Sequence, residues 1–208
     1  TYSHLRSLGL ENISNPNDLQ IHDLEVPFSG KESQSSFGNS SFYYLTKAIE
    51  IVKQYPNSAL VTGPICKKSW TQAGHCFSGQ TEVLAQSCGV KNVGMLFTAK
   101  SPMTGWRFNT LLATTHIALC EVPKKLNSQL IHSKLDLFKD FCCTYTKKPT
   151  IRVAGLNPHA GEEGILGKEE RDWLNDSLLA WNKKNEDIRL LGPLSPDSCW
   201  NSSAKAWT

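Results

Sequence analysis

Two histidines stand in turns whose residue types suit metal binding. His159 lies in "GLNPHAGEEG" directly after the apolar run "IRVA", and His116 ends the triplet "TTH" after the apolar run "FNTLLA". Neutral imidazole is a common ligand of zinc and related divalent ions. The two histidines are too far apart in sequence to share a helical face, so only the fold could unite them. In the simpler alternative, each histidine only hydrogen-bonds a carbonyl of its own turn.

Other polar residues surround His159. Asn157, two residues earlier, could orient a ligand histidine or a substrate through its amide. Glu162 and Glu163 could be ligands or a base, but such a pair also commonly caps a helix or is simply solvated. Two imidazoles leave a site incomplete, because catalytic zinc usually has three protein ligands and an open position.

A second candidate site is the glycine-spaced loop "GHCFSGQTEVLAQ", residues 74–86, which runs into a predicted helix. Ser78, Gln80 and Thr81 would lie at its N-terminus, where free N–H groups and the helix dipole favour an anion such as phosphate. The alternative is ordinary N-capping by Ser78 or Thr81. The sequence has neither a G-x-G-x-x-G fingerprint nor a P-loop, so a nucleotide would not be held by the usual Rossmann first turn.

The elements that must position these residues alternate between helices and strands. Apolar residues at three- and four-residue steps predict helices, and short apolar runs predict strands. The predicted helices cover residues 42–55, 81–88, 122–145 and 168–184, and the predicted strands cover 58–62, 92–99, 108–114, 150–155 and 188–192. The runs lack strict alternation, which favours strands covered on both faces. We therefore predict an α/β fold with a mostly parallel sheet.

Three unusual turns follow predicted strands: "TGP" (62–64), "TTH" (114–116) and "NPHAGE" (157–162). Ligands of open parallel sheets bind beyond the carboxyl ends of the strands. The three turns are therefore expected to point into one crevice. Residues 29–41, "SGKESQSSFGNSS", have little apolar content and predict an exposed, mobile loop.

Composition narrows the classes of protein that fit. The net charge of +3 and the lack of any long Lys/Arg run give no indication of nucleic-acid binding. No apolar stretch approaches the roughly 20 residues of a membrane span. Seven cysteines without a C-x-x-C spacing argue against a disulfide framework or a thiolate zinc site and favour the cytoplasm. The chain begins without Met and ends in "SSAKAWT", so we expect it to be part of a longer protein.

Three segments together resemble the family of 4-hydroxythreonine-4-phosphate dehydrogenases, which acts in pyridoxal phosphate (pyridoxine) biosynthesis. They are "ALVTGPICKKSWTQAGHCFSGQTEVLA", "LLATTHIALCEVPKKL" and "IRVAGLNPHAGEEGILGKEE", and "LLGPLSPD" fits as well. The similarity spans most of residues 42–194. The combination of the TTH and NPHAGE turns is specific to this family.

The resemblance implies a two-subdomain α/β/α fold of the isocitrate and isopropylmalate dehydrogenase type. It also implies a homodimer with its active site at the interface, and a divalent metal such as zinc, magnesium or cobalt held by three histidines. By resemblance His116 and His159 are two of the metal ligands, and the third belongs to a later "HDQG" motif that this chain does not contain. The family's "TPGEPAGIGP" stretch is missing as well, so residues 1–208 would be a partial domain.

By the same resemblance, Thr81 and Gln80 contact the substrate. The family usually has "GHTE" where this chain has "GQTE", so Gln80 replaces a histidine. A glutamine can still donate a hydrogen bond but cannot become cationic near neutral pH. This departure puts the identity of the small phosphorylated substrate in question.

The implied reaction is NAD- or NADP-dependent oxidation of 4-phosphohydroxy-threonine, followed by decarboxylation to 3-amino-2-oxopropyl phosphate. Three alternatives stay open: a sister dehydrogenase of 4-phospho-threonate or 4-phospho-erythronate, a non-catalytic metal-binding homologue, and a metal-dependent hydrolase. The resemblance assigns no general base. Because the third histidine is missing, we expect residues 1–208 alone to be inactive or nearly so.

Overall fold

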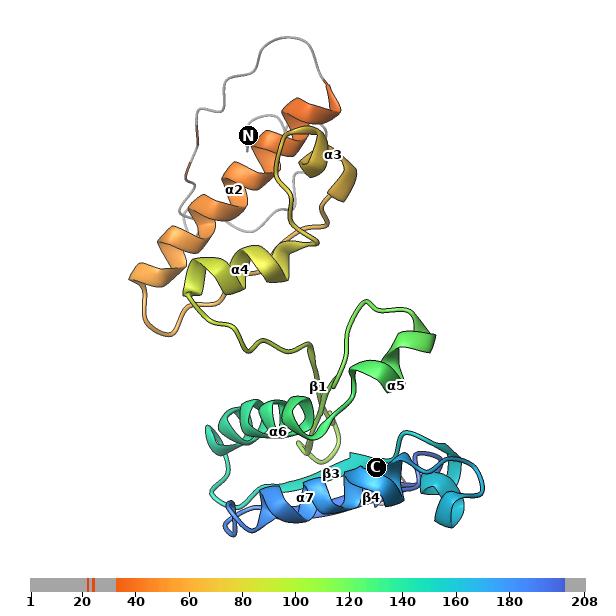
Figure 1. Ribbon diagram of the computed structural model, residues 1–208. Coiled ribbons are helices and arrows are strands. Elements are labelled where there is room, and N and C mark those ends of the chain that lie inside the picture. The colour runs from red at the N-terminus through yellow and green to blue at the C-terminus, as the bar shows by residue number, and fades with distance from the viewer. Residues whose placement is uncertain (1–21, 23, 25–32, 201–208) are drawn as a thin grey trace. The chain divides into compact units, whose positions relative to one another are not determined.

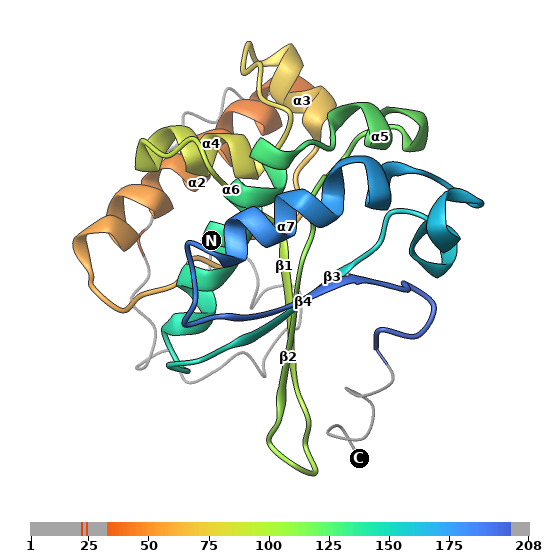
Figure 2. The same cartoon turned by 60° about the horizontal axis from the view of Figure 1, so that its bottom comes forward.

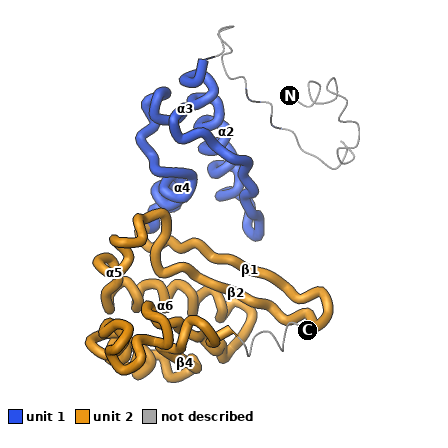
Figure 3. Tube along the Cα trace, turned by 90° about the vertical axis from the view of Figure 1, so that its right-hand side faces the viewer, with its two compact units in different colours: residues 1–90 blue, residues 91–208 orange. Residues whose placement is uncertain are grey.

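The computed structural model describes residues 22, 24 and 33–200. The chain divides into two compact units, residues 1–90 and residues 91–208, shown in different colours in Figure 3. Gln80 and Thr81 belong to unit 1, and both candidate metal ligands belong to unit 2.

The described part of unit 1 contains three helices: α2 (Gln34–Gln54), α3 (Lys67–Gln72) and α4 (Gln80–Cys88) (Figure 1). Its core consists of Leu45 and Ile49 of α2, Trp70 of α3 and Val83 of α4, each at most 6% exposed. The three- and four-residue apolar spacing of the predicted helices therefore corresponds to the buried face of α2. Helix α4 ends at Gly89, whose left-handed φ of 67° forms the expected stop.

The predicted loop at residues 29–41 is wrong from residue 34 onward, because α2 begins there; residues 29–32 lie outside the described residues. Ser33 and Ser36 form a reciprocal capping box that starts the helix despite its polar composition. Gly38 then lets α2 approach α3, since a Cβ at that position would lie 2.0 Å from the carbonyl oxygen of Ser69. Packing and capping thus form a helix where composition indicated a loop.

The strand predicted at residues 58–62 is not formed. The segment has no strand assignment, and Val61 is 93% exposed. A strand needs a hydrogen-bonded neighbour, and the described part of unit 1 contains no strand. An apolar run in the sequence does not show whether a partner strand exists.

As far as residue 200, unit 2 contains four strands in two pairs. Strands β1 (Leu96–Lys100) and β2 (Arg107–Leu111) form an antiparallel hairpin, and β3 (Thr150–Ala154) and β4 (Arg189–Leu194) form a parallel pair. Figure 2 shows the hairpin projecting beyond the parallel pair. The α/β class is confirmed, but a mostly parallel sheet is not found: one of the two described pairs is antiparallel, because a short turn joins β1 directly to β2.

Helices α6 (Ser128–Cys143) and α7 (Asn175–Asn182) lie against the parallel pair (Figure 2). Between them Ile131, Leu135, Ile151, Leu178 and Trp181 form a core in which no side chain is more than 8% exposed. Shorter elements connect these helices: η2 (Leu119–Glu121), α5 (Val122–Lys125), η3 (Pro158–Gly164) and the π-helical turn η4 (Glu170–Leu174).

Two further observations concern membrane-spanning helices and disulfides. Among the described residues, no helix combines the length and apolar composition that crossing a bilayer requires. All seven cysteines are free thiols.

Candidate functional site

The turn that carries His159 is left-handed. After β3 the chain enters η3, where five consecutive residues, His159 to Glu163, have φ between 45° and 81°. Four of them are not glycine. A left-handed conformation costs roughly 1–2 kcal/mol per non-glycine residue, so surrounding contacts must hold this turn in place. Backbone strain of this kind is concentrated at binding and catalytic sites.

Asn157 and Glu170 hold the start of the turn. The main-chain N–H of Asn157 donates to Oε1 of Glu170 at 2.7 Å, and its Nδ2 donates to Oε2 at 2.9 Å. Nδ2 also donates to Oε2 of Glu169 at 2.7 Å. Glu170 is only 3% exposed. Burial by itself would raise the pKa of Glu170, but the hydrogen bonds from Asn157 outweigh it, and the pKa is lowered.

The glycines of the motif make room for this carboxylate. A Cβ at Gly161 would lie 2.8 Å from Oε2 of Glu170, and one at Gly155 would lie 3.0 Å from Oε1. At Gly167 a Cβ would overlap the amide of Asn157, at 2.2 Å. The glycines of "GLNPHAGEEGILG" therefore lie against the Asn157–Glu170 pair, where any side chain would collide with it.

His159 is also joined to the turn that follows β4. Its main-chain N–H donates to Oδ2 of Asp197 at 3.1 Å, and the hydroxyl of Ser195 donates to the same oxygen at 2.9 Å. The hydrogen bond from His159 is the main reason that the pKa of Asp197 is lowered. The imidazole of His159 itself is exposed, and so are the side chains of Glu162 and Glu163.

His116 has the same backbone conformation. Its φ is 55°, and its side chain is exposed in the turn between β2 and η2. Both predicted metal ligands therefore occupy left-handed positions, which only a few per cent of non-glycine residues adopt. This backbone conformation distinguishes the two histidines from most of the chain, since only six described non-glycine residues have a positive φ.

The residues that begin the two histidine turns line the same cavity. This cavity, of about 410 Å³, is lined by Thr114 on the β2 side and by Gly155 and Leu156 on the β3 side. Its other walls are mostly apolar. The two turns lie toward the same end of unit 2 (Figures 1 and 2). No cluster of three or more His, Cys, Asp or Glu side chains able to hold a metal occurs in the described part of the chain.

In unit 1, Gln80 connects the "TGP" turn to the start of α4. The hydroxyl of Thr62 donates to Oε1 of Gln80 at 2.6 Å, and Nε2 of Gln80 donates to the carbonyl of Gly63 at 3.0 Å. Thr81 is exposed at the first turn of α4. The N-cap of α4 is Gly79, and no side chain caps it, so capping by Ser78 or Thr81 is not what the helix uses.

Lys67 also lies at this end of α4. A Cβ placed on Gly79 would be 4.0 Å from the Lys67 ammonium nitrogen. A cation and uncapped N–H groups at a helix N-terminus form a suitable environment for an anion.

Two residues of the site were not predicted from the sequence. Glu170 falls within the helix predicted at residues 168–184, with no role assigned to it, and Asp197 falls within the matching segment "LLGPLSPD". The signal for Glu170 was available in the crowding of glycines around Asn157, which suggests a buried group that leaves no room for a Cβ. No local signal pointed to Asp197, because its partner lies 38 positions away.

Comparison with known proteins places these features in a family. The model of "Pyridoxal phosphate biosynthetic protein PdxA" matches residues 3–207. The 4-hydroxythreonine-4-phosphate dehydrogenase of Synechococcus sp. (strain RCC307) is 45% identical over 209 residues, covering 100% of this chain and 64% of the relative. The enzyme of the same name from Synechocystis sp. (strain ATCC 27184 / PCC 6803 / Kazusa) is 42% identical, covering 94% of this chain and 58% of the relative.

Solved structures agree on the fold. A 4-hydroxythreonine-4-phosphate dehydrogenase from Klebsiella pneumoniae superposes with a TM-score of 0.76 at 24% identity, covering 93% of this chain and 60% of that one. One from Burkholderia phymatum gives 0.66 at 25% identity, covering 89% and 54%. The chain thus spans about three fifths of the length of the curated relatives it matches. It belongs to the PdxA family of pyridoxal phosphate biosynthetic proteins.

Proposed function

We propose that a protein containing this chain oxidises 4-phosphohydroxy-threonine with NAD or NADP and decarboxylates the product to 3-amino-2-oxopropyl phosphate. The observation that carries the proposal is that the two histidine turns characteristic of the family are both left-handed and both lead from one cavity. The names of the relatives support the same activity.

His116 and His159 would supply two nitrogen ligands to a divalent metal such as zinc, magnesium or cobalt. The described residues fit this role in part, because both imidazoles are exposed and no third ligand accompanies them. When bound, the metal would supply Lewis-acid stabilisation of negative charge on the substrate oxygen. Two sets of hydrogen bonds hold the turn, those of Asn157 to Glu170 and that of His159 to Asp197. The turn would therefore hold His159 in position before the metal binds.

The N-terminus of α4 would contact the substrate. Thr81 is exposed in the first turn of α4, and Lys67 adds positive charge that favours a phosphate. Gln80 is already bonded to Thr62 and Gly63, but its amide keeps a second N–H that it can donate. We therefore propose Thr81 as a direct contact and Gln80 as a contact that also holds the "TGP" turn.

The remaining family properties belong to the same proposal. They are the isocitrate dehydrogenase-type arrangement of subdomains, a homodimer with its active site at the interface, and a cytoplasmic location. Gln80 favours one second candidate, a sister dehydrogenase of 4-phospho-threonate or 4-phospho-erythronate. A neutral amide at this position gives no positive charge to a substrate group that the family's histidine could meet as a cation.

Metal binding is tested first, on the 208-residue chain. Isothermal titration with Zn²⁺ and Co²⁺ should detect a site that His116→Ala and His159→Ala each weaken by at least about tenfold, as expected for losing one of few ligands. His22→Ala removes an exposed histidine elsewhere and is the matched control. Equal affinity in all three variants would remove the metal site from the proposal.

Turnover is tested in a chimera in which this chain replaces the matching part of the Synechococcus sp. (strain RCC307) enzyme. Reduction of NAD or NADP, with release of CO₂, is expected with 4-phosphohydroxy-threonine. Preference for 4-phospho-threonate would support the sister dehydrogenase instead. Metal binding without any cofactor reduction would indicate a non-catalytic homologue, and release of phosphate alone would indicate a hydrolase.

A further inference from the structure

The β3–β4 pair has one face covered by helices and one face that carries arginines. Ile151 and Leu190 point toward α6 and α7 and belong to the core. Because side chains alternate along a strand, Arg152 of β3 and Arg189 of β4 lie on the opposite face, and both are exposed. Parallel sheets are ordinarily apolar on both faces. A face with two arginines is therefore suited to contact something other than an apolar layer.

The register brings the two arginines within reach of one ligand. Thr150 pairs with Arg189, and Arg152 pairs with Leu191, so the arginines are diagonal neighbours two residues out of step. From the strand spacing and the rise per residue, their Cα atoms are roughly 8 Å apart. Two guanidinium groups on stems of this length can meet a single phosphate, which arginine binds through paired N–H donors.

This face is the floor of a pocket of about 630 Å³. Arg107 and Lys148 also line the pocket, and among the described residues that line it there is no Asp or Glu. Arg107 lies over the ring of Tyr145, 5.8 Å from its centroid. The pocket therefore concentrates positive charge at the amino ends of β3 and β4.

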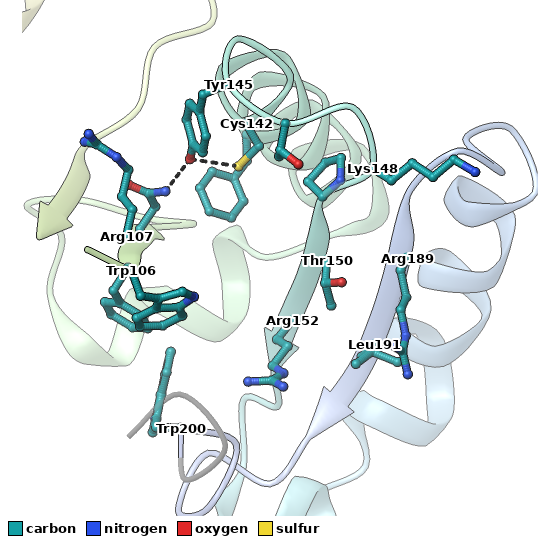
Figure 4. A pocket seen from close by; sticks show the side chains of 15 residues that line it. Trp106, Arg107, Cys142, Tyr145, Lys148, Thr150, Arg152, Arg189, Leu191 and Trp200 are labelled. Carbon is teal, nitrogen blue, oxygen red and sulfur yellow. Dashed lines mark hydrogen bonds between the residues drawn. The ribbon is translucent and has the colours of Figure 1, made fainter. Parts of the chain in front are cut away.

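Aromatic side chains form another wall. Trp106 and Phe108 of the hairpin segment have ring centroids 5.8 Å apart, and Trp200 meets Phe108 edge-on at 5.9 Å. Figure 4 shows Trp106 and Trp200 on the side of the pocket that faces Arg152. Trp200 is exposed and Trp106 is half-buried. Tryptophan rings beside arginines offer a stacking surface for a planar ring whose phosphate binds the cations.

We propose that this pocket binds a small phosphorylated ligand with a planar ring, of the mononucleotide class. Arg152 and Arg189 bind the phosphate, and Trp106 and Trp200 stack on the ring. The pocket lies at the amino ends of β3 and β4, whereas the His159 turn follows the carboxyl end of β3. It shares Arg152 and Trp200 with the 410 Å³ cavity beside the histidine turns, whereas Trp106, Lys148 and Arg189 line this pocket and not that cavity. Binding of adenosine monophosphate and binding of Zn²⁺ are measured in separate titrations, so either proposal can fail without the other.

The test measures binding of adenosine monophosphate, adenosine and inorganic phosphate to the 208-residue chain by titration calorimetry. Adenosine monophosphate should bind at least about tenfold more tightly than adenosine, since charge-assisted bonds from two arginines depend on the phosphate. Arg189→Gln and Arg152→Gln should each weaken it about tenfold. Trp106→Leu should weaken adenosine monophosphate while leaving inorganic phosphate unchanged.

Arg171→Gln is the matched control, because Arg171 is an exposed arginine of unit 2 outside the pocket, paired with Asp172. If Arg189→Gln does not fold, Arg189→Lys is tested instead. Lysine keeps the positive charge but lacks the paired N–H donors of the guanidinium, so its affinity for adenosine monophosphate should lie below that of the unmodified chain and above that expected for Arg189→Gln. The proposal is overturned if the Arg189 variants bind like Arg171→Gln, or if adenosine binds as well as its monophosphate. Much tighter binding of a single-stranded oligonucleotide would also overturn it, by indicating a nucleic-acid surface.

Discussion

Asn157 donates to both oxygens of the Glu170 carboxylate, one bond from its main-chain nitrogen and one from its side-chain amide. This pair joins the start of the left-handed His159 turn to the π-helical turn η4, which is 13 positions further along the chain. The exposed imidazole is thus presented from a turn whose base is buried. The stability of the turn and the position of the candidate metal ligand His159 therefore depend on the same carboxylate, that of Glu170.

Glu170→Gln should destabilise unit 2 by about 1.5–3 kcal/mol, because the new amide nitrogen cannot accept a bond from Asn157 and the side chain is buried. Urea unfolding followed by circular dichroism measures the change. The control Glu186→Gln alters an exposed glutamate of the same unit and should shift stability by less than about 0.5 kcal/mol. Equal stability of the two variants would contradict the role given to Glu170.

The free energy of unfolding should fall as the pH is lowered below about 4.3, the ordinary pKa of a glutamate in an unfolded chain. Since the pKa of Glu170 is lowered in the folded state, the unfolded chain binds the proton first. The stabilisation by Glu170 is therefore present above that pH and is lost as the pH falls through the lowered value. Urea titrations at several acidic pH values should show a shallower decline for Glu170→Gln. Parallel curves for the two proteins would refute the assignment.

Gly161→Ala should cost more than Gly105→Ala. Both glycines are in unit 2 with positive φ, 81° and 71°, so both pay roughly 1 kcal/mol for a left-handed alanine. Only at Gly161 would the new Cβ also collide, at 2.7 Å from the carbonyl oxygen of Gly167 and 2.8 Å from Glu170. At Gly105 the nearest atom is a lysine side chain at 3.8 Å. Thermal unfolding of both variants measures the difference, and a smaller loss at Gly161 would argue against the crowded turn.

Cys66 should be alkylated by iodoacetamide faster than Cys142 at neutral pH. A hydrogen bond from Ser69 lowers the pKa of the exposed Cys66 thiol, whereas burial raises the pKa of Cys142. The thiolate is the reactive form, so rates follow these directions. Peptide mass spectrometry over a time course gives the order. Ser69→Ala should slow Cys66 alone, with exposed Cys120 as the internal control; an unchanged rate at Cys66 would exclude the hydrogen bond as the cause.

The sequence by itself determined the kinds of elements in unit 2 and the turns that matter. Apolar spacing located β3 and β4 within a few residues, because burial of one face requires that spacing whatever the surroundings. It also predicted the end of α6, but the single helix predicted over residues 122–145 is divided into α5 and α6, because Asn127 caps a new helix there. The family motifs pointed to His116 and His159, since metal ligands and tight turns need particular residue types.

Tertiary structure alone decided the rest. Residues 34–41 are helical because Gly38 packs closely against Ser69. Residues 58–62 form no strand, and the described part of unit 1 contains no strand that could pair with them. Glu170 joined the site through contacts with Asn157, and Asp197 joined it through a bond to His159. These outcomes depend on which distant groups meet, and a hydrogen bond or a collision with a Cβ is set by spatial distance rather than by local sequence.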